Sequence, residues 1–142
     1  MKLLLVVASL LVCAVVLGAA VAGPAAVSYF DHDKVAKGGS LVTEPGYTVS
    51  MNSRNATGQV EVHEKETDIF YVTQGEATFV TGGKMIGGKV SRPNQLLGTD
   101  IEGGEAHHLT KGDVVVIHAG TPHWFKQVPQ SIQYFVVKSI QP

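Results

Sequence analysis

The stretch GDVVVIHAGTPHWFKQ, residues 112–127, decides the fold of this 142-residue chain. Within it, Val114–Ile117 and His123–Gln127 are short runs of β-branched and aromatic residues, which favour strands. Glycines at positions 112 and 120 mark turns before and between these runs. We therefore expect two short strands joined by a tight turn, with His123 opening the second strand.

Four further segments have the same composition. They are residues 60–63, 69–73, 77–81 and 132–137. Turn signals at 74–75 and 82–83 separate them, and no helical stripe of useful length follows residue 23. Many short strands with regular turns are typical of an all-β sandwich or closed barrel.

The glycine-rich segment 82–104 interrupts this rhythm. It is too long for an ordinary hairpin loop, and long loops in compact domains are often functional. Leu96, Leu97 and Ile101 supply apolar positions with which the segment can fold over a barrel mouth as a lid. A plain surface excursion fits the pattern equally well.

The first 22 residues have the pattern of a secretory signal peptide. Lys2 precedes an apolar run over residues 3–17, and Ala20 and Ala22 are the small residues that cleavage requires. An uncleaved membrane anchor is the alternative, although the run is at the lower edge of bilayer-spanning length. We therefore expect a signal peptide over 1–22, an arm over 23–40, a barrel domain over 41–142, and a secreted or periplasmic protein.

Cleavage would change the composition of the chain. It removes Lys2 and the only cysteine, Cys13, so the mature chain forms no disulfide. Ten Lys and Arg residues would then face twelve Asp and Glu residues, a net charge of −2. This near-neutral balance argues against electrostatic binding of nucleic acid or acidic lipid, and no membrane contact is expected after cleavage.

Two histidines and two carboxylates are the candidate metal ligands. Glu61 and His63 point the same way if 60–63 is a strand, because residues i and i+2 share a face. Asp68 opens the next strand, and His123 opens a strand far along the chain. Such a set suits one divalent transition metal, namely Fe, Mn, Zn or Ni. His107 is an alternative ligand or pocket base, because it shares a face with Leu109.

The opening stretch resembles the second motif of the cupin family, which runs Gly, five residues, Pro, one residue, Gly, two residues, His. Gly112, Gly120 and His123 keep this spacing. His118 stands in the proline place, and Gln127 stands where the family often has Asn. The resemblance covers about residues 40–138 and implies a single-domain jelly-roll barrel of two antiparallel sheets.

The first motif of the family is altered in this chain. It ends in a metal-binding Glu followed by six residues and a Gly, and counting back from Gly75 places Asp68 at that Glu. His63 falls at the family's second His, and Glu61 falls at its first. Both replacements can still ligate a metal, so the resemblance implies a site made of Glu61, His63, Asp68 and His123.

Two classes of function fit the candidate ligands and the family resemblance. One is a metal-dependent oxygenase, isomerase or lyase acting on a small organic molecule, with Glu61 or Asp68 as base if either is free of metal. The other is a non-catalytic binding or sensor barrel without metal chemistry. The partner expected in both classes is a small-molecule ligand, and the resemblance leaves a homodimer open.

Overall fold

The computed structural model describes residues 26–142, so the expected signal peptide over 1–22 lies outside the described residues. The described part contains one short helix and twelve strands. The bounds are α1 His32–Ala36, β1 Gly39–Glu44, β2 Tyr47–Arg54, β3 Val60–His63, β4 Glu66–Thr81, β5 Lys84–Ile86, β6 Lys89–Arg92, β7 Gln95–Gly98, β8 Asp100–Glu102, β9 Glu105–Thr110, β10 Val114–Ile117, β11 His123–Gln127 and β12 Ile132–Ile140. Among these residues no helix is both long and apolar enough to cross a membrane.

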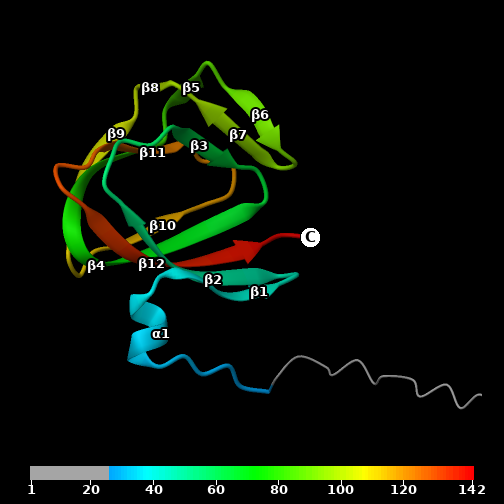
Figure 1. Ribbon diagram of the computed structural model, residues 1–142. Helices are drawn as coiled ribbons and strands as arrows, with labels where there is room; N and C mark the ends of the chain where they lie inside the picture. Colours follow the sequence, from blue (N-terminus) through cyan, green and yellow to red (C-terminus); the bar gives the residue numbers. More distant parts are fainter. Residues whose placement is uncertain (1–25) are drawn as a thin grey trace, which may run out of the picture.

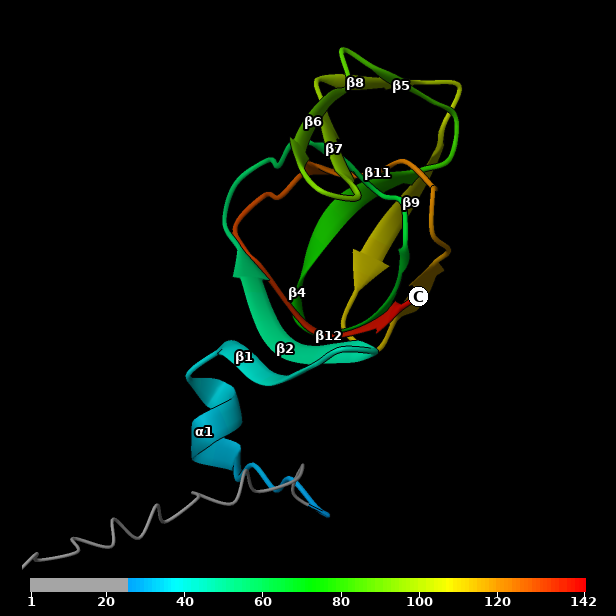
Figure 2. The same cartoon turned by 90° about the vertical axis from the view of Figure 1, so that its right-hand side faces the viewer.

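Ten of the strands form two antiparallel layers that share β4, and β5 pairs with β8 in a separate two-stranded sheet. The first half of β4 pairs with β12 and β10, and β12 continues to β2 and β1. The second half of β4 pairs with β11 and β9, and β11 continues to β3, β7 and β6. Figure 1 shows the two layers facing each other across the barrel interior, and Figure 2 shows the same barrel from the side. The structure thus confirms an all-β jelly-roll barrel of two antiparallel sheets.

Aromatic side chains fill one end of the interior. They are Phe70, Phe79, Phe125 and Tyr134, whose neighbouring ring centroids lie 4.6–6.1 Å apart. All four are buried, as are the aliphatic residues that alternate with exposed positions on the same strands. Side chains of a strand with one face in the core alternate between buried and exposed positions. The buried aromatic rings exclude water from one side of the site described below.

Three details of the strands differ from the sequence-based expectation. Residues 69–73 and 77–81 belong to one 16-residue strand, because the backbone bends at Gly75 without ending the ladder. Segment 82–104, for which the sequence leaves a lid or a plain surface excursion open, forms β5 to β8, and its strand β7 pairs with β3. The arm contains α1, whose first turn is capped by the side chain of Asp31 accepting a hydrogen bond from the Lys34 amide.

Gly75 is the position at which β4 passes from one sheet to the other. Its φ of 76° is in the left-handed region, and a methyl group added there would collide with the carbonyl oxygen of Ser131. We expect Gly75→Ala to destabilise the fold by about 3 kcal/mol or more, measured by urea unfolding, because strain and collision add. Gly82→Ala is the control: its φ is 71° but nothing crowds it, so about 1 kcal/mol is expected. Equal losses in the two variants would contradict the importance of the Ser131 contact.

Candidate metal site

Strand pairing brings the predicted site residues to one place in the barrel. Glu61 and His63 extend from β3, and His123 at the start of β11 is the direct cross-strand partner of Glu61. Asp68 extends inward from β4, where it is buried in the same row as Phe70. The four residues that the sequence singled out therefore converge, although they come from three strands.

Glu61, His63 and His123 form one group of candidate ligands. Each offers one ligand atom, and these atoms lie within 4.8 Å of one another. His63 Nε2 is 3.4 Å from Glu61 Oε2, and the two imidazole centroids are 5.2 Å apart. Two imidazoles and a carboxylate make up the donor set of many mononuclear transition-metal sites.

His123 has a fixed tautomer. Its Nδ1 lies 3.0 Å from the carbonyl oxygen of Thr121, and a carbonyl oxygen can only accept, so Nδ1 carries the proton. Burial lowers the pKa of His123 below its usual value, although the Thr121 carbonyl and the Asp68 carboxylate oppose the shift. The ring is therefore neutral at pH 7, and the lone pair on Nε2 faces the cluster as a metal ligand requires.

Asp68 occupies a different environment from Glu61. Both of its carboxylate oxygens lie 2.8 Å from Lys138 Nζ, and one of them is 3.6 Å from His63 Nε2 and 4.0 Å from His123 Nε2. It is almost fully buried. Asp68 thus lies beside both histidines, and the Lys138 ammonium group compensates its charge.

Glu66 also belongs to the cluster, although the sequence analysis missed it. Its Oε2 is 3.5 Å from His63 Nδ1 and 3.0 Å from Lys138 Nζ, and Glu66, His63 and Asp68 form a second group of ligand atoms within 4.8 Å. The alternation of side chains along a strand could have revealed it. β4 begins at Glu66, two residues before the predicted start at Asp68, so Glu66 and Asp68 share one face of the strand.

Two basic residues of the site were missed for a similar reason. Lys138 follows Tyr134 and Val136 on the inward face of β12, beyond the predicted end of that strand at 137. Arg54 ends β2, a strand that the composition did not single out, and its Nη2 donates to Glu61 Oε1 at 2.9 Å. His107, the alternative ligand, instead hydrogen-bonds to Thr81 Oγ1 at 2.9 Å and joins neither group of ligand atoms.

The carboxylates of the cluster are paired with basic side chains. Arg54 pairs with Glu61, Lys138 pairs with Glu66 and Asp68, and Arg92 Nη2 lies 3.4 Å from Glu66 Oε1. Burial alone would raise the pKa of Glu61, but the hydrogen bond from His63 and the charges of His123 and Arg54 outweigh it and lower the pKa to about 2. Burial likewise opposes ionisation of Glu66, yet Lys138 lowers its pKa. Both glutamates are therefore ionised at neutral pH.

The space beside the cluster is small. A cavity of about 60 Å³ is bounded by the ligand atoms, by the aromatic side chains of the core and by Arg54. A buried water needs roughly 10–15 Å³ by this measure, so an ion and a few waters fit there. Pockets for drug-sized organic ligands measure about 300–1,000 Å³, which is far larger.

A family model described as Cupin matches residues 26–142. The chain therefore belongs to the cupin family. A search of curated proteins finds no match.

Solved structures show the same fold at low sequence identity. BH2720 from Bacillus halodurans aligns with a TM-score of 0.58 and 14% identity over 84% of this chain and 85% of that chain. TT1209 from Thermus thermophilus aligns with a TM-score of 0.55 and 16% identity over 82% of this chain and 100% of that chain. The cupin domain of Cnp3 from Schizosaccharomyces pombe aligns with a TM-score of 0.52 and 11% identity over 73% of this chain and 60% of that chain. This chain therefore spans less than two thirds of the length of that one.

The donor set also fits the metal that cupins commonly bind. His63 Nδ1 is buried without a hydrogen-bond partner, and His123 Nε2 presents a free lone pair to the cluster. A divalent cation would use nitrogen and oxygen donors that Fe, Mn, Zn and Ni accept. The identity of the ion is a prediction, and so is the four-residue ligand set.

The low pKa of Glu61 predicts how the free energy of unfolding depends on pH. A carboxyl whose pKa is lowered on folding stabilises the native state above its usual pKa of 4.5, and this contribution is lost as the pH falls toward about 2. We expect metal-free Glu61→Gln to be less stable than wild type at pH 7, with the difference shrinking below pH 4.5. Urea unfolding at pH 7, 5 and 3 measures it.

Glu64→Gln is the matched control for this experiment. Glu64 is exposed on the turn between β3 and β4, so its removal should change stability little at each pH. A difference between Glu61→Gln and wild type that stays constant from pH 7 to pH 3 would contradict the assigned charge state.

Proposed function

We propose that this protein is an exported cupin that binds one divalent transition metal through Glu61, His63 and His123. The observation that carries the proposal is the meeting of these three ligand atoms within 4.8 Å at one wall of the barrel. Asp68 and Glu66 belong to the surrounding shell, because Lys138 already takes their oxygens. A three-residue set leaves coordination positions open for water or a small ligand, as in catalytic sites.

The residues around the ion have separable tasks. Thr121 orients His123 through Nδ1, and Arg54 holds Glu61 through Oε1 while Oε2 stays turned toward His63. The buried phenyl rings of the core exclude bulk water from one side. A bound divalent metal would polarise an oxygen ligand or lower the pKa of a bound water.

Metal analysis tests the proposal most directly. The purified protein, reconstituted separately with Fe, Mn, Zn and Ni and then desalted, should retain close to one equivalent of at least one metal. His63→Ala and His123→Ala should each lower the affinity by about 100-fold or more, because each removes a ligand from the proposed three. Equilibrium competition with a chelator gives the affinities.

Two further variants serve as controls for that measurement. His118→Ala removes an exposed histidine and should leave the affinity unchanged. Asp68→Asn should keep the metal with a loss smaller than that of either histidine variant. Full occupancy in both His63→Ala and His123→Ala would overturn the ligand assignment, and no retention of any of the four metals by wild type would overturn the metal site.

The small-molecule ligand is proposed to bind beside the ion rather than inside the barrel core. A pocket of about 420 Å³ adjoins the small cavity and shares Asn52, Arg54 and Tyr134 with it. Lys37 and Arg54 are the only charged residues among those that line this pocket, so it favours an anion. An organic carboxylate paired with Arg54 would lie next to the open metal positions.

Removing the Lys37 charge tests this carboxylate site. We expect small mono- and dicarboxylates such as acetate and succinate to bind, with Lys37→Gln weakening binding several-fold because one of two positive charges is lost. Isothermal titration calorimetry or chemical-shift titration of the metal-loaded protein gives the affinities. Lys89→Gln, on exposed β6, is the control and should behave as wild type. Equal affinities in all three proteins would contradict the pocket assignment without affecting the metal site.

The metal-free binding barrel is supported less well than the metal site. Its ligand would have to enter the barrel interior, where Phe70, Phe79, Phe125 and Tyr134 leave only the small cavity.

Export is proposed on the signal-peptide pattern alone. Mass spectrometry of the protein secreted by an expression host should find an N-terminus at Gly23.

A further inference from the structure

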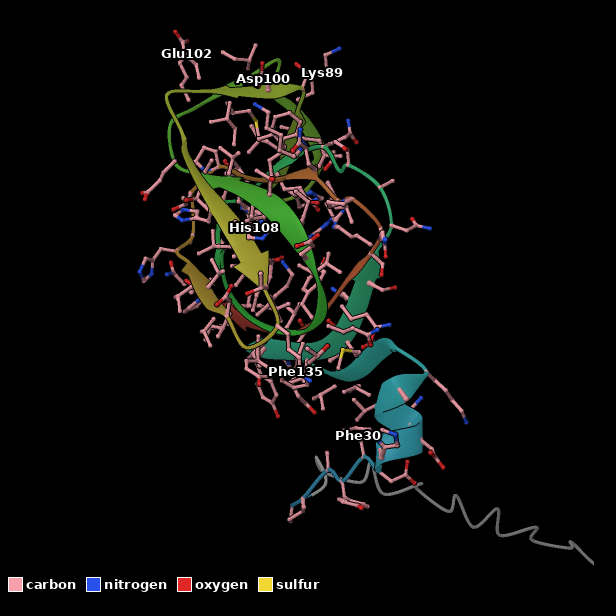
Figure 3. All side chains as sticks on the ribbon, turned by 90° about the vertical axis from the view of Figure 1, so that its left-hand side faces the viewer. Phe30, Lys89, Asp100, Glu102, His108 and Phe135 are labelled. Atoms are coloured by element: carbon pink, nitrogen blue, oxygen red, sulfur yellow. The ribbon has the colours of Figure 1, made fainter. Side chains whose placement is uncertain are left out.

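Strand pairing places Lys138 directly beside Asp68. Tyr134, Val136 and Lys138 share the inward face of β12, whereas Phe135 lies on the side of the sheet away from the barrel interior (Figure 3). In the antiparallel ladder Lys138 is the cross-strand partner of Asp68 on β4. Side chains of such partners extend from neighbouring points on one face, so the register of the two strands sets this contact.

The ammonium group of Lys138 has one carboxylate oxygen for each of its three hydrogen-bond donors. Its Nζ lies 2.8 Å from both oxygens of Asp68 and 3.0 Å from Oε2 of Glu66. An ammonium carries three donors and no acceptor, so these contacts use all of its capacity. Asp68 is only 2% exposed, so bulk water does not replace Lys138 as its partner. Both oxygens of Asp68 are therefore engaged in charge-assisted hydrogen bonds.

Glu61 is held differently by its own basic partner. Arg54 Nη2 lies 2.9 Å from Oε1, while Oε2 is turned toward His63 Nε2 at 3.4 Å. Arg54 thus engages one oxygen of Glu61 and leaves the other available to an ion, whereas Lys138 engages both oxygens of Asp68. The two carboxylates differ in what their basic partners leave free.

Asp68 is nevertheless close enough to both imidazoles to bind the same ion. Its Oδ2 is 3.6 Å from His63 Nε2 and 4.0 Å from His123 Nε2. Metal–ligand bonds of about 2.0–2.2 Å place neighbouring ligand atoms about 3–3.5 Å apart, so a small movement of Asp68 would complete a fourth contact. An ion bound there would meet the ammonium group of Lys138 across a single oxygen atom, and two cations repel each other strongly in a poorly hydrated site.

We propose that Lys138 limits the metal to three protein ligands by holding Asp68 outside the coordination sphere. The inference rests on the proposed metal site, and it leaves the ligands Glu61, His63 and His123 unchanged. Lys138 is a positioning residue, because it acts on the metal only through Asp68. The number of coordination positions open to water or a small ligand is then set by a side chain that does not itself bind the ion.

Replacing Lys138 by methionine tests the inference, with Co(II) as the probe because its visible absorption reports coordination geometry. The purified Lys138→Met protein with one equivalent of Co(II) should have a spectrum different from wild type. It should also bind Co(II) about tenfold or more tightly in chelator competition, because Asp68 becomes a ligand and a neighbouring positive charge is lost. Lys138→Met/Asp68→Asn should restore the wild-type spectrum, whereas Lys138→Met/Glu66→Gln should keep the altered one.

Two control variants separate the release of Asp68 from a change of charge. Lys126→Met makes the same substitution at an exposed position of β11 and should match wild type in spectrum and affinity. Arg92→Gln removes a positive charge that lies 3.4 Å from Oε1 of Glu66 and leaves the pair of Lys138 and Asp68 intact. Its Co(II) spectrum should therefore equal that of wild type.

Circular dichroism checks that the variants keep their fold. Lys138→Met leaves two carboxylates without their counter-ion, which can be strongly destabilising. If it does not fold, Lys138→Met/Glu66→Gln is compared with the same protein carrying Asp68→Asn, and only the former should show the altered spectrum.

An unchanged Co(II) spectrum in folded Lys138→Met would overturn the inference and leave the metal site intact. Restoration of the spectrum by Glu66→Gln instead of Asp68→Asn would also overturn it. So would a second equivalent of Co(II) in Lys138→Met, because the released carboxylates would then form a site of their own. A wild type that retains no metal would overturn the proposed metal site, and the inference with it.

Discussion

The structure depends on one strand that belongs to two sheets. β4 hydrogen-bonds to β12 and β10 through its first half and to β11 and β9 through its second half, with Gly75 at the bend. Because a single backbone spans both layers, the position of one layer fixes the position of the other. His123 is held against Thr81 at the far end of β4, while Asp68 lies near its beginning. The metal cluster forms where these ladders converge.

Electrostatics then determines what the barrel interior can hold. Glu61 and Glu66 are kept ionised in a poorly hydrated space by Arg54, Lys138 and Arg92 and by the hydrogen bond from His63, and a buried charge without such partners would be very costly. The ionised Glu61 and the neutral His123 favour a cation, while the aromatic core leaves little room for anything larger. The interior is therefore suited to an ion rather than to an organic molecule.

Much of this arrangement could be predicted from the sequence, because it follows from local patterns. The resemblance of Gly112, Gly120 and His123 to the second cupin motif implied the jelly-roll barrel, and the alternation of Glu61 and His63 placed them on one face. Other features depend on tertiary pairing that no local pattern encodes. Segment 82–104 was ambiguous because glycine-rich sequence does not specify strands, yet β7 gains a ladder from β3.

The missed site residues show the same limit. Lys138 and Arg54 are ordinary basic residues in the sequence, and only the closed barrel turns them inward to meet Asp68 and Glu61. Glu66 was missed because strand ends are the least reliable part of any sequence-based assignment.

The ion pair between Lys138 and Asp68 has a consequence for the metal-free protein. Lys138 is a counter-ion that the chain itself supplies to Asp68 and Glu66. These two carboxylates therefore need no bound metal to offset the cost of burying them. This distinguishes the barrel from small zinc domains, in which metal binding is the folding energy. Binding of an ion would thereby be uncoupled from folding, and occupancy of the site would follow the metal supply of the surroundings.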